Sequence, residues 1–428
     1  MRHPDTGEGR GPVRYGPPLP EPGLPVLPEL AAVVAGAAGR TRPEPPGGPP
    51  ALLEAVRGHG ERRGLAPGRA RVTAAPGGAP LLLALTAALG GDVLVPRPCA
   101  AWWSPQTRLL GHEVFSVPTP AECGGVPDPY ALLETVHRVR AEGGRPRLLV
   151  VAPADDPTAT VPPPEVLHEA VEAAVGEGLH VVSDETWRDT LHPGRDTPLF
   201  SPAEMFPADV TVLTDLTGAH LPPSLPAACA RFPPTPEGDR LAARVLDVLT
   251  ATGATLSAPV AAAAAYALDD GDAVTARRAA AAALHGRVAT ALHHVVLKAG
   301  CLSRPPRAGR HLYVDLEPLR PRLSALGVTD AQDLEDHLGA RLGLPAPGGH
   351  RFGDDQGALR CRLGTAPLLG ATPDERGAAL TSPDPLELPH VARALTMVES
   401  VLAELGDLGD RAGPDGTGAA GEGWESER

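Results

Sequence analysis

The sequence contains very little lysine. Lys+Arg totals 38 and Lys298 is the only lysine, which leaves 37 arginines among 428 residues. A bias toward Ala, Arg, Gly and Pro, as in GC-rich coding sequences, accounts for part of this shortage. It still has a chemical consequence, because any reaction that needs a lysine amine must use Lys298 or borrow a lysine from another chain.

Other features are scarce as well, and each shortage excludes a class of protein. Basic residues form no run and the formal net charge is −14, which argues against nucleic-acid and acidic-membrane partners. No apolar run reaches the length of a membrane span, and the first residues lack a hydrophobic signal core, so we expect a cytoplasmic protein. The five cysteines never form CxxC spacing and the fifteen histidines include no HExxH, so we expect neither a disulfide framework nor a metal site.

Proline and glycine are abundant, with 52 and 49 residues, but 42 % of the chain is hydrophobic and the apolar residues gather into blocks. We therefore predict folded domains between low-complexity ends. The predicted parts are a Pro/Gly-rich N-terminal arm (1–45), a large α/β domain (46–265), a small α+β domain (266–404) that also takes part of the N-terminal segment, and a disordered acidic tail (405–428).

Apolar runs that end in polar residues alternate with helical patterns in the large domain. The pattern predicts buried strands at 92–96, 113–118, 148–153, 180–185 and 209–215, with helices over 50–63, 81–89 and 165–176. Such alternation predicts a three-layer α/β/α domain with a mostly parallel sheet and ligands at its carboxyl edge. Long helices over 261–299, strands at 311–318 and 358–366, and helices near 329–342 and 386–405 predict the smaller domain.

An ordered set of segments has the character and spacing of one known family. The segments are GPPALLEAVRGHGERRGL (48–65), VTAAPGGAPLLLAL (72–85), GDVLVPRPCAAWW (91–103), APADDPTAT (152–160), VVSDETWRD (181–189), VTVLTDLTGAHLPPSL (210–225) and CRLGTA (361–366). Together they resemble the class I/II aminotransferases, which are fold-type I enzymes that use pyridoxal phosphate (PLP). The resemblance implies that fold, and it implies PLP as the cofactor.

The resemblance also implies roles for individual residues. Asp184 matches the acid that faces the pyridine nitrogen, and Arg362 matches the arginine that holds a substrate carboxylate. Other matching positions imply contacts to the phosphate or the ring: Gly77, Gly78, Ala79, Trp103, Asp156, Trp187 and Thr217. The ring-stacking aromatic itself aligns with Ala100, so Trp103 or its neighbour Trp102 would have to replace it.

Several of these residues have structural alternatives. The alternative for Asp184 is the cap of the following helix, and the alternative for Gly77, Gly78 and Ala79 is a plain tight turn. Arg362 would also suit a salt-bridged strand position, and Arg360 is its rival two residues away.

The segment at 210–225 departs from the family. The position of the Schiff-base lysine is Gly218, that of the phosphate arginine is Pro226, and that of a phosphate-binding hydroxyl is Asp215. A carboxylate at Asp215 would repel a phosphate. Lys298 falls at a predicted helix end in the small domain, where we expect it to face solvent. The usual chemistry, in which a lysine retains the cofactor covalently and carries a proton, is therefore not expected.

His220 lies two residues after Gly218. Sugar 3-dehydratases that resemble aminotransferases use a histidine as the base in place of the lysine, so His220 and Asp184 are the candidate catalytic residues. The alternative for His220 is a partly exposed structural histidine in a loop.

These observations leave several hypotheses. The first is an aminotransferase-like pseudoenzyme or non-catalytic subunit, acting as a homodimer or with a lysine-bearing homologue. The second is a lysine-independent tailoring enzyme of bacterial specialised metabolism that acts on an amino acid, a peptide or a similar carboxylate. The third is an active PLP-dependent aminotransferase with an atypical site, and the last is a regulator with an aminotransferase-like effector domain. In the first two, PLP is bound without a covalent link or not at all.

Overall fold

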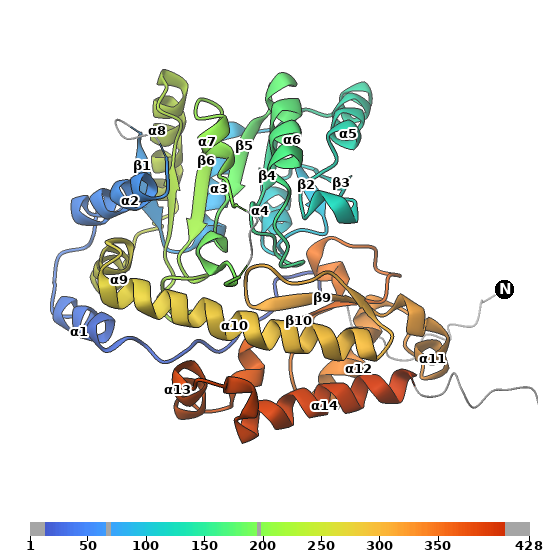
Figure 1. Cartoon of the computed structure of the whole chain (residues 1–428). Helices are drawn as coiled ribbons and strands as arrows, with labels where there is room; N and C mark the ends of the chain where they lie inside the picture. The colour runs from blue at the N-terminus through green and yellow to red at the C-terminus, as the bar shows by residue number, and fades with distance from the viewer. Residues whose placement is uncertain (1–12, 66–69, 195–197, 407–428) are drawn as a thin grey trace, which may run out of the picture.

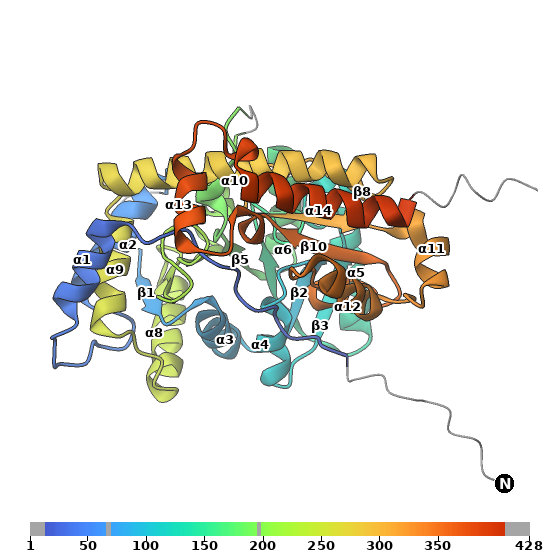
Figure 2. The same ribbon diagram turned by 90° about the horizontal axis from the view of Figure 1, so that it is seen from below.

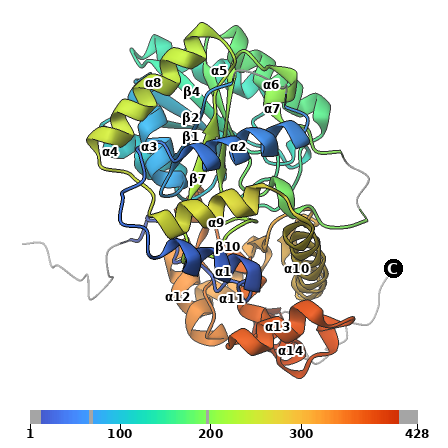
Figure 3. The same ribbon diagram turned by 90° about the vertical axis from the view of Figure 1, so that its left-hand side faces the viewer.

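The computed structural model describes residues 13–65, 70–194 and 198–406. Within these ranges two lobes form, one around a seven-stranded sheet and one around a three-stranded sheet (Figures 1 and 3). Residues 1–12 of the predicted arm and residues 407–428 of the predicted tail lie outside the described residues.

The large lobe is organised by a sheet of strand order β1-β7-β6-β5-β4-β2-β3. β7 runs antiparallel to both of its neighbours, and the other pairs are parallel. The strands are β1 (Val72–Ala75), β2 (Asp92–Arg97), β3 (Val114–Pro118), β4 (Pro146–Val151), β5 (His180–Asp184), β6 (Val210–Asp215) and β7 (Ala228–Arg231). The predicted strands and the predicted α/β fold class are confirmed, whereas the short strands β1 and β7 were not predicted.

Helices cover both faces of this sheet, because its strands are apolar on both sides. In β4, Leu148 and Val150 belong to the hydrophobic cluster on the face covered by α3 and α8, and the alternating Leu149 and Val151 belong to the cluster on the face covered by α5 and α6. The helices of the lobe are α2 (Pro50–Arg62), α3 (Gly78–Leu89), α4 (Trp103–Leu109), α5 (Pro129–Ala141), α6 (Pro164–Gly176), α7 (Pro202–Met205) and α8 (Pro236–Ala251).

The small lobe packs below the large one, and the long helix α10 runs along the junction (Figure 1). Its antiparallel sheet has the order β10-β9-β8 and a hydrophobic core of its own. Helix α9 (Ala258–Leu268) packs with α1 (Pro28–Ala37) and α2 in the hydrophobic cluster of the large lobe that includes β1 and β7. The elements of the small lobe are α10 (Asp272–Lys298), β8 (Leu302–Ser303), β9 (His311–Asp315), α11 (Arg320–Ala325), α12 (Ala331–Leu342), β10 (Arg360–Gly364), α13 (Pro373–Thr381) and α14 (Pro389–Gly406).

The N-terminal arm is not extended throughout. It contains a helix, α1 (Pro28–Ala37), which starts with Pro at its first position and packs against α9 (Figure 3). In the part of the chain that the structure describes, no helix has the length and apolar character needed to cross a membrane.

Candidate functional site

A cavity of about 400 Å³ lies at the carboxyl edge of the large sheet, facing the small lobe. Its floor comes from residues that follow β4, β5 and β6, as expected for the carboxyl ends of parallel strands. The lining residues that matter below are Glu21, Trp102, Asp156, Trp187, Asp215, Thr217, Gly218, Arg310, His311 and Arg362.

Asp184, at the end of β5, is buried and is not among the residues that line this cavity, although Thr186, two residues further on, is. Its carboxylate accepts hydrogen bonds from Trp103 Nε1 at 2.8 Å and from the Thr186 amide and hydroxyl at 3.0 and 2.5 Å. Burial raises the pKa of Asp184 to about 6, against the opposing effect of these hydrogen bonds. The indole of Trp103 is therefore a partner of Asp184, and its neighbour Trp102 is the tryptophan that lines the cavity.

The predicted phosphate cradle is filled by a side chain of the protein. At the N-terminus of α3, the Gly78 amide donates to Asp215 Oδ2 at 2.7 Å. The other oxygen of Asp215 accepts from the Thr217 amide and hydroxyl at 2.9 and 2.6 Å. Gly77 has a φ of 128° and its amide bonds to Ala75 O, while Ala79 lines the cavity. Two of the residues expected to bind a phosphate, Gly78 and Thr217, thus donate to a carboxylate instead.

The lysine position offers no space for a side chain. A Cβ on Gly218 would overlap the carbonyl oxygen of Thr186, so any larger residue requires the backbone to move. The Gly218 carbonyl accepts a hydrogen bond from Arg310 Nη2. Lys298 lies at the end of α10, is 76 % exposed and pairs with Glu399 at 2.5 Å. The structure does not bring Lys298 to the cavity.

Arg362, on β10, reaches the cavity from the small lobe. Its Nη1 donates to Asp156 Oδ1 at 2.8 Å, and its guanidinium lies 4.8 Å from the Phe352 ring centroid. Burial alone would raise the pKa of Asp156, but Arg362 and His311 hold it below its usual range. The buried Nε of Arg362 has no hydrogen-bond partner among the described residues. Arg362 therefore has both a fixed acid and an unused donor.

The other candidates at this end are arranged around Arg362. Its rival, Arg360, pairs with Asp315 and Asp354 instead of lining the cavity. Trp187 packs edge-to-face on His311, and the Arg310 guanidinium lies 5.5 Å from its ring centroid. The structure thus brings Asp156, Trp187 and Arg362 together, as the resemblance implies.

His220 faces away from the cavity into a buried network of charges. Its Nε2 lies 3.0 Å from Asp189 Oδ2, and its ring packs edge-to-face on His59 at 5.0 Å. Its side chain is 1 % exposed, and burial lowers the pKa of His220 to about 4 although Asp189 opposes the shift. The turn that follows β6 rotates this histidine away from Gly218, so the two positions do not share one site.

His59, Asp189 and His220 each place a ligand atom within 4.8 Å of the others, a spacing that a metal ion would require. However, Arg63 already binds both oxygens of Asp189, at 2.9 and 2.8 Å. Asp270 joins the network through His59 Nδ1 at 3.0 Å. We interpret these residues as a neutralised ionic network between α2, the loop after β5 and the loop before α10.

The sequence did not identify Glu21, Arg310 and His311 as lining residues of the cavity, and it left open whether Trp102 or Trp103 lines it. Arg310 and His311 lie at the start of β9, beside β10, and Gly364 of β10 pairs with His311. The predicted strand at 311–318, if paired with the predicted strand that carries Arg362, would have placed both residues near the site. The arm carries no local pattern that places Glu21 there.

Comparison with known proteins agrees with this architecture. Residues 37–208 match the family model described as Aminotransferase class I and II. The chain is 35 % identical over 181 residues to the aspartate/prephenate aminotransferase of Thermus thermophilus, which covers 41 % of this chain and 45 % of that protein. A match of 34 % over 175 residues to a probable aspartate/prephenate aminotransferase of Thermus aquaticus covers 43 % of that relative. The sequence match therefore spans less than half the length of these curated relatives.

The fold resemblance extends over most of the chain. The structure of Thermus thermophilus aspartate aminotransferase with maleate superposes with a TM-score of 0.68 at 23 % identity, covering 89 % of this chain and 90 % of that one. The aromatic aminotransferase of Pyrococcus horikoshii gives a TM-score of 0.71 at 18 % identity, covering 91 % and 95 %.

Proposed function

We propose that this chain, a member of the class I and II aminotransferase family, has kept the family's carboxylate-binding end and has lost its Schiff-base chemistry. The observation that carries this proposal is the position of Asp215, whose two oxygens take the Gly78 and Thr217 donors at the phosphate cradle. A fixed anion at that place competes with a phosphate for the same N–H groups and repels it.

The family implies PLP as the cofactor, and the residues of this chain do not fit it. Besides the filled cradle, the lysine position has no space for a side chain, and the arginine expected to bind phosphate is Pro226. We therefore derive no step through PLP. An active aminotransferase with an atypical site would have to move Asp215 and the Gly218 backbone, so we do not favour that alternative.

The remaining chemistry is that of a carboxylate-binding site. Arg362 offers its unpartnered Nε, Asp156 fixes the guanidinium, and Arg310 adds a second positive charge. Trp102 and Trp187 form apolar walls, which suits a ligand with a small organic body. An amino acid, a peptide terminus or a similar carboxylate fits this combination.

We favour a non-catalytic role over a lysine-independent enzyme. His220, the imidazole that the sequence offered as the base of such an enzyme, is buried against Asp189 outside the cavity, and the imidazole that does line the cavity, His311, lies 3.4 Å from the Asp156 carboxylate. A homodimer or a heterodimer with a lysine-bearing homologue, a cytoplasmic location and a place in bacterial specialised metabolism remain predictions.

A calorimetric titration of the full-length chain tests the proposal. Maleate and L-aspartate are suitable probes, because the related proteins are named for aspartate and one was solved with maleate. We expect wild type to bind, and the double variant Arg362→Met, Asp156→Asn to bind roughly ten- to a hundredfold more weakly, since a charge-assisted hydrogen bond contributes about 1.5–3 kcal/mol. The single variant Arg360→Met is the matched control. Equal binding by the double variant would contradict the assignment.

A further inference from the structure

The segment that precedes α1 crosses the molecule as an extended strap, which we define as residues 14–27 (Figure 2). It contains neither helix nor strand. Its middle part is rich in proline, with Pro17, Pro18, Pro20 and Pro22. Proline fixes φ and removes amide donors, so this part is stiff and makes few backbone hydrogen bonds.

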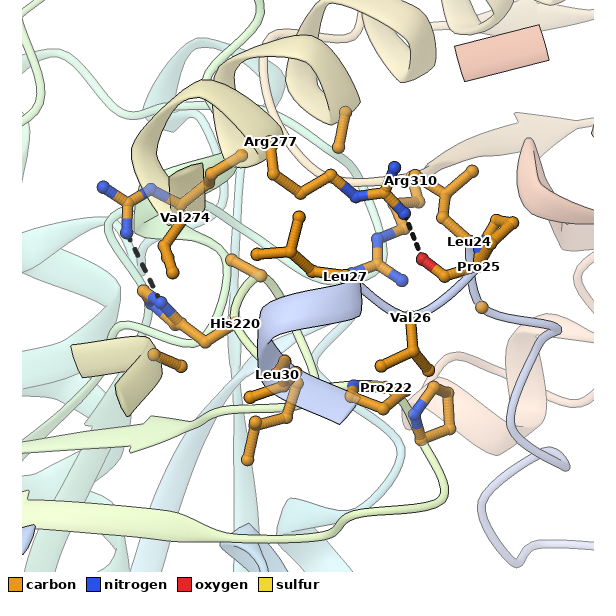
Figure 4. Close-up of a pocket in the computed structure, with 17 residues that line it drawn as sticks. Leu24, Pro25, Val26, Leu27, Leu30, His220, Pro222, Val274, Arg277 and Arg310 are labelled. Atoms are coloured by element: carbon orange, nitrogen blue, oxygen red, sulfur yellow. Dashed lines mark hydrogen bonds between the residues drawn. The ribbon is translucent and has the colours of Figure 1, made fainter. Parts of the chain in front are cut away.

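Arginines of the folded lobes hold the strap on both sides of this stiff part. Arg351 Nη1 donates to Gly16 O at 2.6 Å, and Arg376 Nε donates to Gly23 O at 2.9 Å. Farther along, Arg277 Nη2 of α10 donates to Pro25 O at 2.5 Å, which Figure 4 shows beside Leu24 and Arg310. The strap is therefore fixed at defined points, and these anchors determine where residues 17–22 lie.

The residue presented between the anchors is Glu21, which lines the same cavity as Arg310 and Arg362. The Glu21 carboxyl stands where a Cβ of Gly364 would be, so even an alanine at that position would overlap it. Gly364 follows Arg362 by two residues on β10, and positions two apart on a strand share a face. The carboxyl thus lies beside Arg362 in space that the missing side chain of Gly364 leaves free.

The two arginines favour the charged form of this carboxyl, but less strongly than burial opposes it. Burial raises the pKa of Glu21, and the attraction of Arg362 and Arg310 offsets this only in part. The opposite balance holds for Asp156, whose pKa is lowered because the charges of Arg362 and His311, together with the direct hydrogen bond from Arg362, outweigh the effect of burial. Among the described residues, the Nε of Arg362 still lacks a partner. Asp156 is thus the permanent partner of Arg362, and Glu21 is held more weakly.

We propose that Glu21 is an internal ligand of the Arg310–Arg362 carboxylate site, and that an external carboxylate binds by displacing Glu21 and the strap that carries it. This inference rests on the proposed function and adds a competitor to it. The external ligand is a small organic carboxylate that reaches the Nε of Arg362, and its own carboxylate replaces that of Glu21. Affinity for such a ligand is then lowered by the fraction of time that Glu21 occupies the site.

The size of this effect follows from simple competition. If Glu21 occupies the site for about nine-tenths of the time, the apparent affinity for an external carboxylate falls about tenfold. A substitution that removes the charge of Glu21, or one that fills the space its carboxyl occupies, should reverse this tenfold loss of affinity.

The test is a calorimetric titration of maleate into four forms of the full-length chain: wild type, Glu21→Gln, Gly364→Ser and Glu29→Gln. Glu21→Gln removes the competing charge, so we expect it to bind maleate about tenfold more tightly than wild type. Gly364→Ser expels the carboxyl sterically, so it should also bind more tightly, and it provides an independent result if Glu21→Gln folds poorly. Glu29→Gln changes an exposed residue of α1 and should match wild type.

Two outcomes distinguish this inference from the proposed function. If wild type, Glu21→Gln and Gly364→Ser all bind maleate with equal affinity, Glu21 is not a competitor and the inference is overturned. If none of these forms binds maleate or L-aspartate, the carboxylate site itself is wrong and the proposed function fails with it.

Discussion

The two ends of the cavity are both occupied by acids of the chain, but in different ways. At the cofactor end, Asp215 belongs to β6 and bonds directly to the Gly78 amide and to Thr217. At the carboxylate end, Glu21 lies on a strap without secondary structure and, within the described part of the chain, interacts with Arg310 and Arg362 through charge alone. The backbone that carries Asp215 is fixed by the pairing of β6 with its neighbours, whereas the backbone that carries Glu21 is not part of a sheet or helix. The first closes a site and the second regulates access to it.

Among the substitutions that test this difference between the two ends, Arg362→Met should have the largest effect on stability. The substitution leaves the Asp156 carboxylate buried without its main partner, which should lower the free energy of unfolding by about 3 kcal/mol. Adding Asp156→Asn removes the stranded charge, so the double variant should regain most of this stability while still failing to bind maleate. Denaturant titration measures the first effect and calorimetry the second. If the double variant is as unstable as Arg362→Met alone, the unpaired carboxylate of Asp156 is not the cause of the lost stability.

A smaller effect is expected from the neighbour of Asp156. Asp155 is buried, its Oδ1 has no partner among the described residues, and burial raises its pKa to about 7 despite hydrogen bonds from Thr158. Because the folded-state pKa lies above the usual value of about 3.9, this carboxyl contributes stability at low pH that is lost as the pH rises toward 7. Wild type should therefore lose about 2 kcal/mol relative to Asp155→Asn between pH 5 and pH 7.

Unfolding curves of both proteins across this pH range measure that difference. Parallel curves, with a constant gap between the two proteins, would mean that Asp155 is already ionised at pH 5 in the folded state.

Asp215→Ser should lower the stability less than the substitutions above do, and its main effect should be on the binding of phosphate. Losing the cap of α3 costs about 1 kcal/mol. The freed Gly78 amide and the new hydroxyl should then raise the affinity for inorganic phosphate about tenfold, since the repelling carboxylate is gone. Asp247→Ser makes the same charge change on the exposed surface of α8 and serves as the control. If both variants bind phosphate like wild type, Asp215 does not block the cradle.

Lys298→Arg should have the smallest effect. The side chain is exposed and its pair with Glu399 lies outside the cavity, so a protein without any lysine side chain should bind maleate as wild type does. Side-by-side titrations decide this, and a weaker affinity in the variant would assign Lys298 a role at the site.

The sequence predicted much of this arrangement. Apolar runs of the right length predicted the main parallel strands, and the acids at their ends, Asp184 and Asp215, lie at the sheet edge where ligands were expected. The matching segments placed Asp156, Trp187 and Arg362 around one cavity. These features follow from local patterns and from the order of segments along the chain.

Other features depend on contacts that no local pattern encodes. The directions in which two adjacent tryptophans point depend on how their helix packs, which the sequence does not give. In the structure, Trp103 donates a hydrogen bond to Asp184 and Trp102 lines the cavity. His220 is close to Gly218 in sequence, but the turn after β6 directs it to Asp189. Glu21 and Gly364 are far apart in the sequence but adjacent in the structure. The path of the strap depends on how the lobes pack, which no local pattern encodes.

The most direct test of the account is a titration of wild-type chain with PLP, followed by borohydride reduction and measurement of the intact mass. The account predicts no tight binding and no reduced phosphopyridoxyl group other than on the exposed Lys298 or the α-amine, because Asp215 fills the phosphate cradle and Gly218 stands at the lysine position. Tight, one-to-one binding of PLP to the chain would contradict it.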